Sequence, residues 1–258
     1  MHKIKILSVF FFFLLCQNVF TQTIDSTKKT TTFSGSLGLT NNGFSIVPAF
    51  SLNAPAAIIL MDWRKGKFSI SPELRVTPDV KRGGIIVWFR YHAIQKGNFT
   101  FRTGFHPAMN LQTRDVISRN LKDTLNLTQM RRFLAWELAP SYKINKHIGV
   151  GLYYLQGNGL QKDGPQTSHF VSFNPSFTNI PLGAKMKFSI IPGVFYLNLD
   201  GYEGTYFSNV TSLSHSKFPI TFTTGINKTI TSNLPGNKDL LWNVGLNYVF
   251  RKKIAQLK

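Results

Sequence analysis

Apolar and polar residues alternate along most of this chain, and this pattern constrains the fold more than any other feature. In DLLWNVGLNYVF, at 239–250, every second residue from Leu240 to Phe250 is large and apolar. The same period of two recurs in KFSISPELRVT at 67–77, NFTFRTGFHPA at 98–108 and RRFLAWELAPSY at 131–142. Successive side chains of a β-strand point to opposite faces. Each segment is therefore predicted to be a strand with one face against an apolar environment.

Turn sequences separate the predicted strands and indicate an all-β chain. They include NNG at 41–43, RKGK at 64–67, QKGN at 95–98, KINK at 143–146 and PG at 192–193. Helical periodicity is weak except at 115–127, where a short helix within a loop is an alternative. No segment beyond the N-terminus holds enough consecutive apolar residues to predict a transmembrane helix.

The N-terminus, MHKIKILSVFFFFLLCQNVFTQ, has the pattern of a secretory signal peptide. Lys3 and Lys5 precede an apolar run that is too short to span a bilayer as a helix. We place cleavage after Thr21, which makes 1–21 the signal peptide and predicts export. Lipidation of Cys16 is disfavoured because the residues before it are bulky. The mature chain then has no cysteine, which excludes disulfides and thiol chemistry.

The charge of the mature chain indicates an anionic partner. Without Lys3 and Lys5 the 30 basic residues become 28, against 11 acidic ones, so the formal charge is +17. The basic residues are spread along an exported chain, so we expect lipid headgroups rather than nucleic acid. Guanidinium groups bind phosphate well. The candidates for contact with lipopolysaccharide phosphates, or alternatively for a solvated basic loop, are Arg114, Arg119, Lys122, Arg131 and Arg132.

Two properties favour an outer-membrane barrel over a soluble sandwich. The connections at 77–82, 111–129, 157–166 and 229–238 are predicted on one side, and the short turns at 64–67, 95–98 and 143–146 on the other, as in bacterial barrels. The exceptions are the tight turns at 53–55 and 192–193, which fall with the long connections, and the long connection at 209–217, which falls with the short turns. Bulky aromatic residues also lie on the apolar faces, several near strand ends, where they would meet the headgroups: Trp63, Trp136, Tyr142, Tyr154, Trp242, Tyr248 and Phe250. We therefore predict a transmembrane antiparallel up-and-down β-barrel over 44–250 in the cell outer membrane.

The barrel is predicted to have twelve strands, with ten or fourteen as the alternatives. They lie near 44–52, 56–63, 67–76, 83–94, 97–110, 130–142, 147–156, 166–177, 183–190, 194–208, 218–228 and 239–250. The segment TFSGSLGLT at 32–40 would be a thirteenth, and single-chain bacterial barrels have even strand numbers. We therefore interpret 22–43 as an N-terminal extension or partial plug, and 251–258 as a basic C-terminal tail.

The last strand resembles the β-signal that the barrel assembly machinery recognises in outer-membrane proteins. The matching residues are Trp242, Val244, Leu246, Tyr248 and Phe250, although the signal usually ends the chain and 251–258 follows it here. More widely, LTNNGFSIVPAFSLNAPAA, WFRYH, GFHPAMNL, RRFLAWELAPSY and VGLYYLQGNG are similar to a family of uncharacterised porin-like outer-membrane β-barrel proteins of Gram-negative bacteria. This resemblance implies a fold and a location, and it carries over no catalytic residues.

Charged residues on the polar faces are the candidates for lining the lumen. They are Asp62, Glu73, Arg75, Arg90, Arg102, Arg131, Glu137, Lys185, Lys187 and Asp200. Their functional interpretation is a mildly anion-favouring lumen, and the alternative is an ion-pair network that fills a narrow barrel. We predict a passive pore for small hydrophilic solutes, anionic ones included, with 111–129 as the candidate constriction or lid.

A barrel hydrolase acting on lipids is an alternative function, and a non-conducting structural or adhesive barrel is a third. Ser168, His106, His147 and His169 are available for hydrolysis, but the chain lacks a G-x-S-x-G motif. The histidines His92, His106, His147, His169 and His215 lack metal-binding spacing. We therefore expect a protein that is not an enzyme and has no cofactor or metal. Residues 123–125, DTL, resemble a bacterial O-glycosylation sequon.

Overall fold

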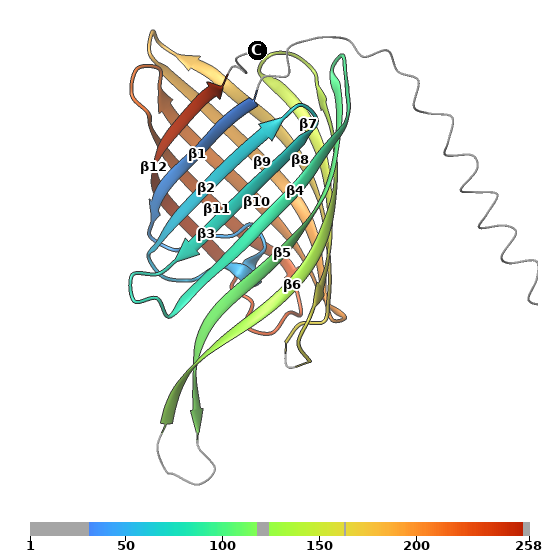
Figure 1. The fold of residues 1–258 in the computed structure, drawn as a ribbon, viewed down its shortest axis with the longest axis vertical. Coiled ribbons are helices and arrows are strands. Elements are labelled where there is room, and N and C mark those ends of the chain that lie inside the picture. The colour runs from blue at the N-terminus through green and yellow to red at the C-terminus, as the bar shows by residue number, and fades with distance from the viewer. Residues whose placement is uncertain (1–30, 118–123, 163, 255–258) are drawn as a thin grey trace, which may run out of the picture.

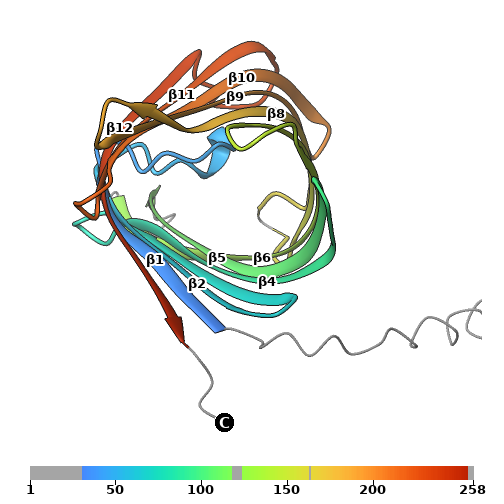
Figure 2. The ribbon, with the colours of Figure 1, turned by 90° about the horizontal axis from the view of Figure 1, so that it is seen from above.

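The protein forms a closed barrel of twelve antiparallel strands, each paired with its neighbours in sequence, and β1 pairs with β12 to close it (Figures 1 and 2). This computed structural model describes residues 31–117, 124–162 and 164–254, so the predicted signal peptide at 1–21 lies outside the described residues. Within them, no helix is long and apolar enough to cross a bilayer. The predicted fold class and strand number are confirmed.

The strands differ in length, and the longest two lie next to each other. The elements are β1 (Thr31–Thr40), η2 (Pro48–Phe50), β2 (Ala56–Lys65), β3 (Phe68–Val76), β4 (Arg82–Lys96), β5 (Phe99–Ile117), β6 (Thr124–Lys143), β7 (Ile148–Gly159), β8 (Thr167–Leu182), β9 (Met186–Leu199), β10 (Tyr202–His215), β11 (Ile220–Ser232) and β12 (Leu240–Ile254). Strands β5 and β6 pair from Phe99↔Tyr142 to Ile117↔Thr124, and their far ends project beyond the barrel wall (Figure 1).

The two ends of the barrel differ in their connections. At the end where β1 begins and β12 stops, strands are joined by short turns at 66–67, 97–98, 144–147, 183–185 and 216–219. At the opposite end lie the longer connections, including 41–55, 160–166 and 233–239. Gly66 and Gly97 have φ values of 61° and 55°, a region that glycine enters at little cost, which suits these two-residue turns. The predicted asymmetry is therefore present.

The sequence prediction misplaced the N-terminal border of the barrel. Residues 32–40, interpreted as part of an extension or plug, belong to β1, which pairs with β12 on one side and β2 on the other. Residues 44–52, predicted as the first strand, instead turn into the barrel and contain η2 (Figure 2). Pro48 explains the second error, because proline cannot donate to a strand ladder but suits the start of a helical turn. The two errors compensate, so the strand number is right.

The prediction also placed one turn wrongly. Pro192 and Gly193 lie inside β9, and the chain reverses at Asp200 and Gly201 instead. Both turn residues have positive φ, 52° and 88°, and such values are typical of tight hairpins. The β8–β9 ladder stops at Phe173↔Val194 and resumes at Phe177↔Ile190, and Pro192, which lacks an N–H, lies in this gap. On its other side Pro192 stays in register with Asn209 of β10. The border predicted between the strands at 183–190 and 194–208 is therefore wrong.

Two further expectations about segments are corrected. The stretch 111–129 is not a lid or a helical loop, because its described part is the paired hairpin of β5 and β6. The stretch 251–258 is not wholly a tail, because β12 continues through Ile254 and pairs there with Thr31. Residues 118–123 and 255–258 lie outside the described part.

The two faces of the wall differ as the alternation predicts. Large apolar side chains such as Leu37, Leu152 and Leu246 are about half exposed on the outward face. Exposed aromatic residues gather near the short-turn end, at Trp63, Phe68, Tyr91, Phe99, Tyr142, Phe218 and Tyr248. The buried side chains point inward, and the tightest group is Phe170, Phe195, Leu197 and Tyr206 with Leu234. The residues that pack most closely therefore fill part of the barrel interior.

Candidate functional site

The strand registers place most of the predicted charged residues on the inner face. Phe105 and Trp136 are paired and exposed, so their neighbours in sequence point inward. The registers carry this alternation from strand to strand. The charged residues that it places on the inner face are Asp62, Glu73, Arg75, Arg90, Arg102, Arg131, Glu137 and Lys187. Lys185 and Asp200 lie in turns at opposite ends of the barrel and not in the wall. Arg132 faces outward, so it diverges from Arg131.

Glu137 on β6 is the centre of the largest ionic cluster inside the barrel. Its side chain is fully buried, and its Oε1 lies 2.8 Å from Arg90 Nε of β4 and 2.9 Å from Arg102 Nε of β5. Its Oε2 accepts a hydrogen bond of 2.8 Å from the Tyr153 hydroxyl of β7. One carboxylate therefore balances only one of two guanidinium charges, and the cluster keeps a net positive charge.

A second group of inward charges holds a loop in place. Arg75 forms an ion pair with Glu73, two residues away on β3. Its Nη1 donates a hydrogen bond of 3.0 Å to the backbone oxygen of Phe44. Asp62 of β2 bonds to the adjacent strand β3, because its Oδ1 accepts a hydrogen bond of 2.6 Å from the Ser71 hydroxyl. Arg75, with its partner Glu73, is therefore part of the scaffold around the loop, whereas Asp62 joins two strands.

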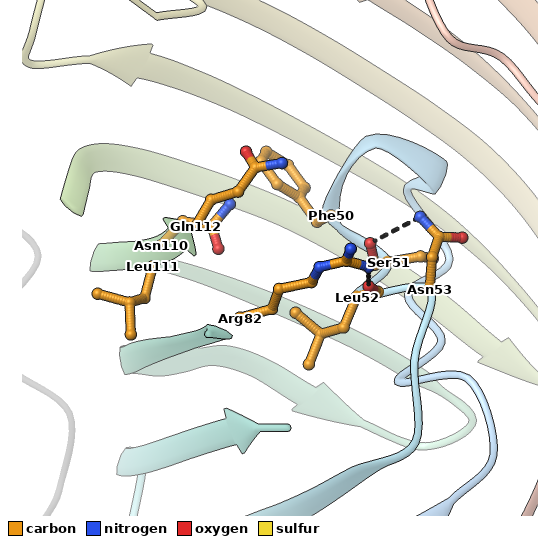
Figure 3. Close-up of a pocket in the computed structure, with 8 residues that line it drawn as sticks. All are labelled: Phe50, Ser51, Leu52, Asn53, Arg82, Asn110, Leu111 and Gln112. Atoms are coloured by element: carbon orange, nitrogen blue, oxygen red, sulfur yellow. Dashed lines mark hydrogen bonds between the residues drawn. The ribbon is translucent and has the colours of Figure 1, made fainter. Parts of the chain in front are cut away.

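That loop, residues 41–55, we call the inner segment, and it lies inside the barrel (Figure 2). Arg82 donates through Nη1 to the Leu52 backbone oxygen at 2.8 Å (Figure 3). From the opposite wall, Asn227 Nδ2 donates to the Ile46 backbone oxygen at 2.6 Å. Gly43, with φ of 51°, makes the turn that starts the segment, where an added Cβ would lie 2.7 Å from Leu52 Cβ. Side chains from both walls thus fix the inner segment across the lumen.

A cavity of about 540 Å³ lies between the inner segment and the wall formed by β3 to β8. Its polar contributors include Arg90, His106 and Asn174. Its apolar contributors are more numerous and include Ile46, Phe50, Ile86, Trp88, Phe133 and Phe170. Sequence analysis missed this apolar lining, because it assigned apolar side chains to the outward face. The available signal was the set of runs with no alternation, such as IIVWF at 85–89 and VFYL at 194–197.

Among the described residues no hydrogen bond joins the candidates for hydrolysis, although Ser168 and His106 line the same cavity. Ser168 and His169 are consecutive on β8 and therefore point to opposite faces, with Ser168 lining the cavity. On the outer face, His169 Nδ1 lies 3.0 Å from the Tyr154 hydroxyl. The Nδ1 atom of His147 lies 3.0 Å from the backbone oxygen of Thr178, at the short-turn end. His106 packs instead against Trp88, with 4.1 Å between the ring centroids.

The other sequence candidates are placed as follows. Among the described residues, no group of three or more His, Cys, Asp or Glu side chains is arranged to hold a metal ion. The predicted assembly signal lies on the outward face of β12, where Trp242, Leu246 and Tyr248 are each more than half exposed. Arg119 and Lys122, two of the candidates for contact with lipopolysaccharide, lie outside the described residues, as does Asp123, the first residue of the predicted glycosylation sequon.

Comparison with solved structures agrees with the fold. No protein-family model and no curated protein matches the sequence. The chain is similar to the KdgM porin, with a TM-score of 0.53 and 12% identity over 84% of this chain and 99% of the porin. A second structure, the KdgM porin in complex with disordered oligogalacturonate, has a TM-score of 0.51 and 12% identity over 85% of this chain and 99% of that chain. An outer-membrane channel from Pseudomonas putida F1 has a TM-score of 0.52 and 10% identity over 90% of this chain and 99% of that chain. The predicted resemblance to porin-like outer-membrane barrels is confirmed at the level of the fold.

Proposed function

We propose that this protein is an outer-membrane pore through which small hydrophilic solutes diffuse passively, with anions favoured. The observation that carries the proposal is the cluster of Arg90, Arg102 and Glu137 inside a closed barrel, which leaves one positive charge uncompensated. A fixed positive charge within a wall of low polarity raises the local concentration of anions and lowers the barrier to their passage.

The outward face supports a location in a membrane. Leu152 and Phe173 lie on the outward face in the middle of their strands and are about half exposed, which is costly in water and favourable against hydrocarbon. The aromatic residues near the short-turn end match the girdles that such barrels place at the headgroups. With export by the predicted signal peptide, the outer membrane of a Gram-negative cell is the proposed site.

The proposed partners follow from the same location. The barrel assembly machinery would recognise the exposed apolar face of β12, from Trp242 to Phe250. Outer-membrane lipid would contact the outward face, and lipopolysaccharide phosphates would contact basic side chains such as Arg132 near the end with long connections.

Transport is supported by the interior and by one of the similar structures. The cavity beside the inner segment is large enough for a small solute. The KdgM porin, which shares this fold, has been solved with disordered oligogalacturonate. The candidate constriction is the inner segment, since it lies across the lumen, whereas the β5–β6 hairpin projects away from the barrel (Figure 1).

Planar bilayer recordings test the proposal. The purified protein should produce discrete conductance steps, and its reversal potential in a salt gradient should show preference for the anion. Replacing Arg102 with Gln should reduce this preference, because Glu137 would then be balanced by Arg90 alone. The matched control is Lys228→Gln, which removes a cation from the outward face and should leave the selectivity unchanged. A barrel that inserts but never conducts would contradict the proposal.

A further inference from the structure

His106 lines the cavity and has a buried ring nitrogen without a hydrogen-bond partner among the described residues. Its side chain is 6% exposed, and its Nδ1 has no hydrogen-bond partner among the described residues. Buried polar atoms are nearly always paired, and one that is not usually marks a place for a missing partner. The ring of His106 lines the cavity while Nδ1 itself is covered, so a molecule bound there reaches this nitrogen after a rotation of the imidazole.

An aromatic surface adjoins His106. The ring centroids of Trp88 and His106 are 4.1 Å apart, and the Arg90 guanidinium lies 4.1 Å from the centre of the Trp88 ring. Phe50 of the inner segment and Phe133 of β6 face each other edge-on at 5.9 Å and line the same cavity. Aromatic side chains favour flat, apolar ligands through stacked and edge-to-face contacts. The body of the bound molecule should therefore be aromatic.

The charge of the site indicates which charged group the aromatic ligand should carry. Arg90 lines the cavity, and its carboxylate partner Glu137 is shared with Arg102. Arg90 already donates to Glu137 through Nε and Nη2. The other charged residues of the lining, Glu73 and Arg75, balance each other. An anionic group would therefore be attracted by the net single positive charge of Arg90, Arg102 and Glu137. A cation would meet an unbalanced positive charge in a cavity with an apolar lining.

We propose that this cavity is a binding site for aromatic carboxylates. The carboxylate lies toward Arg90 and His106, and the ring packs against Trp88 and the apolar wall. A volume of about 540 Å³ suits an acid of one to three rings. The inference names the solute class of the proposed pore and rests on that function for transport, although binding itself requires no conduction.

Calorimetric titration of the detergent-solubilised protein tests the site. The probes are 2-naphthoate, the uncharged 2-naphthylmethanol and acetate. We expect saturable binding of 2-naphthoate at one site, with weaker binding of the alcohol and no measurable binding of acetate. Similar binding of the acid and the alcohol would overturn the role of the positive charge, and absence of saturable binding would overturn the site.

Variants separate the site from general effects on the barrel. His106→Leu should weaken 2-naphthoate binding by about tenfold or more, the scale of one lost charge-assisted bond. Trp88→Leu should weaken it by about two- to tenfold, the scale of one aromatic contact. Ala108→Trp should abolish binding by filling the cavity, since Ala108 lines it. The matched control is Trp63→Leu, which removes an outward-facing indole and should leave affinity unchanged. Unchanged affinity in the folded Ala108→Trp barrel would overturn the proposal.

The result of the binding test can be interpreted independently of the conductance test of the pore. Saturable 2-naphthoate binding to a protein that is silent in planar bilayers would support the site and contradict the pore. Discrete conductance without 2-naphthoate binding would leave the pore intact and overturn the site.

Discussion

Glu137 combines complete burial with three polar partners on three other strands. Arg90, Arg102 and Tyr153 belong to β4, β5 and β7, so the cluster ties together four neighbouring strands of the wall. Desolvation of a carboxylate is costly, and direct bonds to cations offset that cost. Removal of the carboxylate leaves two guanidiniums facing each other inside the barrel.

We expect Glu137→Ala to lower the free energy of unfolding by about 3 kcal/mol, the lower end of the range for breaking a buried pair. The lower end applies because the side chains of Arg90 and Arg102 keep 19% and 34% exposure. Urea unfolding in lipid vesicles measures the change. The control is Asp239→Ala, which breaks an exposed pair with Lys228 and should cost less than about 1 kcal/mol. Equal losses in the two variants would contradict the assigned role of Glu137.

At the residue scale the alternation predicted which charges face inward but not what they contact. Arg90, Arg102 and Glu137 are far apart in sequence, and only the registers of β4, β5 and β6 bring them together. The same holds for Arg75, whose partner Phe44 lies in a segment that was predicted to be a strand. The ion-pair network and the net positive charge, which were weighed as alternatives, occur in the same cluster.

At the scale of elements, the inner segment is the part that differs most from the strand pattern. It connects two adjacent antiparallel strands, β1 and β2, which a short turn could join. Its extra length instead places η2 in the lumen, held by Arg75, Arg82 and Asn227. Because the barrel ladder is complete without it, the inner segment is dispensable for closure.

We expect replacement of 44–52 by a Gly-Ser linker of equal length to raise the single-channel conductance. The linker lacks Pro48 and the apolar side chains that pack toward the cavity, so it should no longer narrow the lumen. The control is removal of 115–126, which takes away the outermost described pairs of β5 and β6 and should leave the conductance unchanged. Conductance that rises only in the hairpin variant would place the constriction there and contradict the assignment.

The sequence predicted most strands but not the role of 32–40 and 44–52, and the reason is physical. Both stretches carry apolar residues at short spacing, so the local pattern of each predicts a strand equally well. What decides is pairing: 31–40 can bond to β12 and β2 along its whole length, whereas Pro48 would interrupt any ladder. Pairing partners are not visible in a local window.

At the scale of the whole molecule, the barrel has an apolar face outside and a mixed face inside. The outward side chains are exposed in the protein by itself, and in the proposed membrane location lipid would cover them. Charge should therefore be tolerated very differently on the two faces of a single strand. Two consecutive residues in the middle of β8 allow that comparison.

We expect Phe173→Arg to lower the free energy of unfolding in vesicles by about 2–4 kcal/mol, as for a lipid-facing arginine near the midplane. Phe173 faces outward and is 48% exposed. Asn174→Arg, on the inner face beside the cavity, should cost distinctly less. The two variants are compared in vesicles by denaturant titration. A larger loss for the inner variant would mean that the outward face does not contact hydrocarbon.

The sequence by itself determined the strand content, the faces of most strands and the difference between the two barrel ends, because these depend on side-chain period and turn residues that act over a few positions. Tertiary structure alone decided the border of the barrel at β1, the place of the inner segment and the cluster around Glu137. These depend on hydrogen-bond registers between strands and on closure of the sheet, which join residues far apart in the chain. A local pattern carries no information about which distant partner completes it.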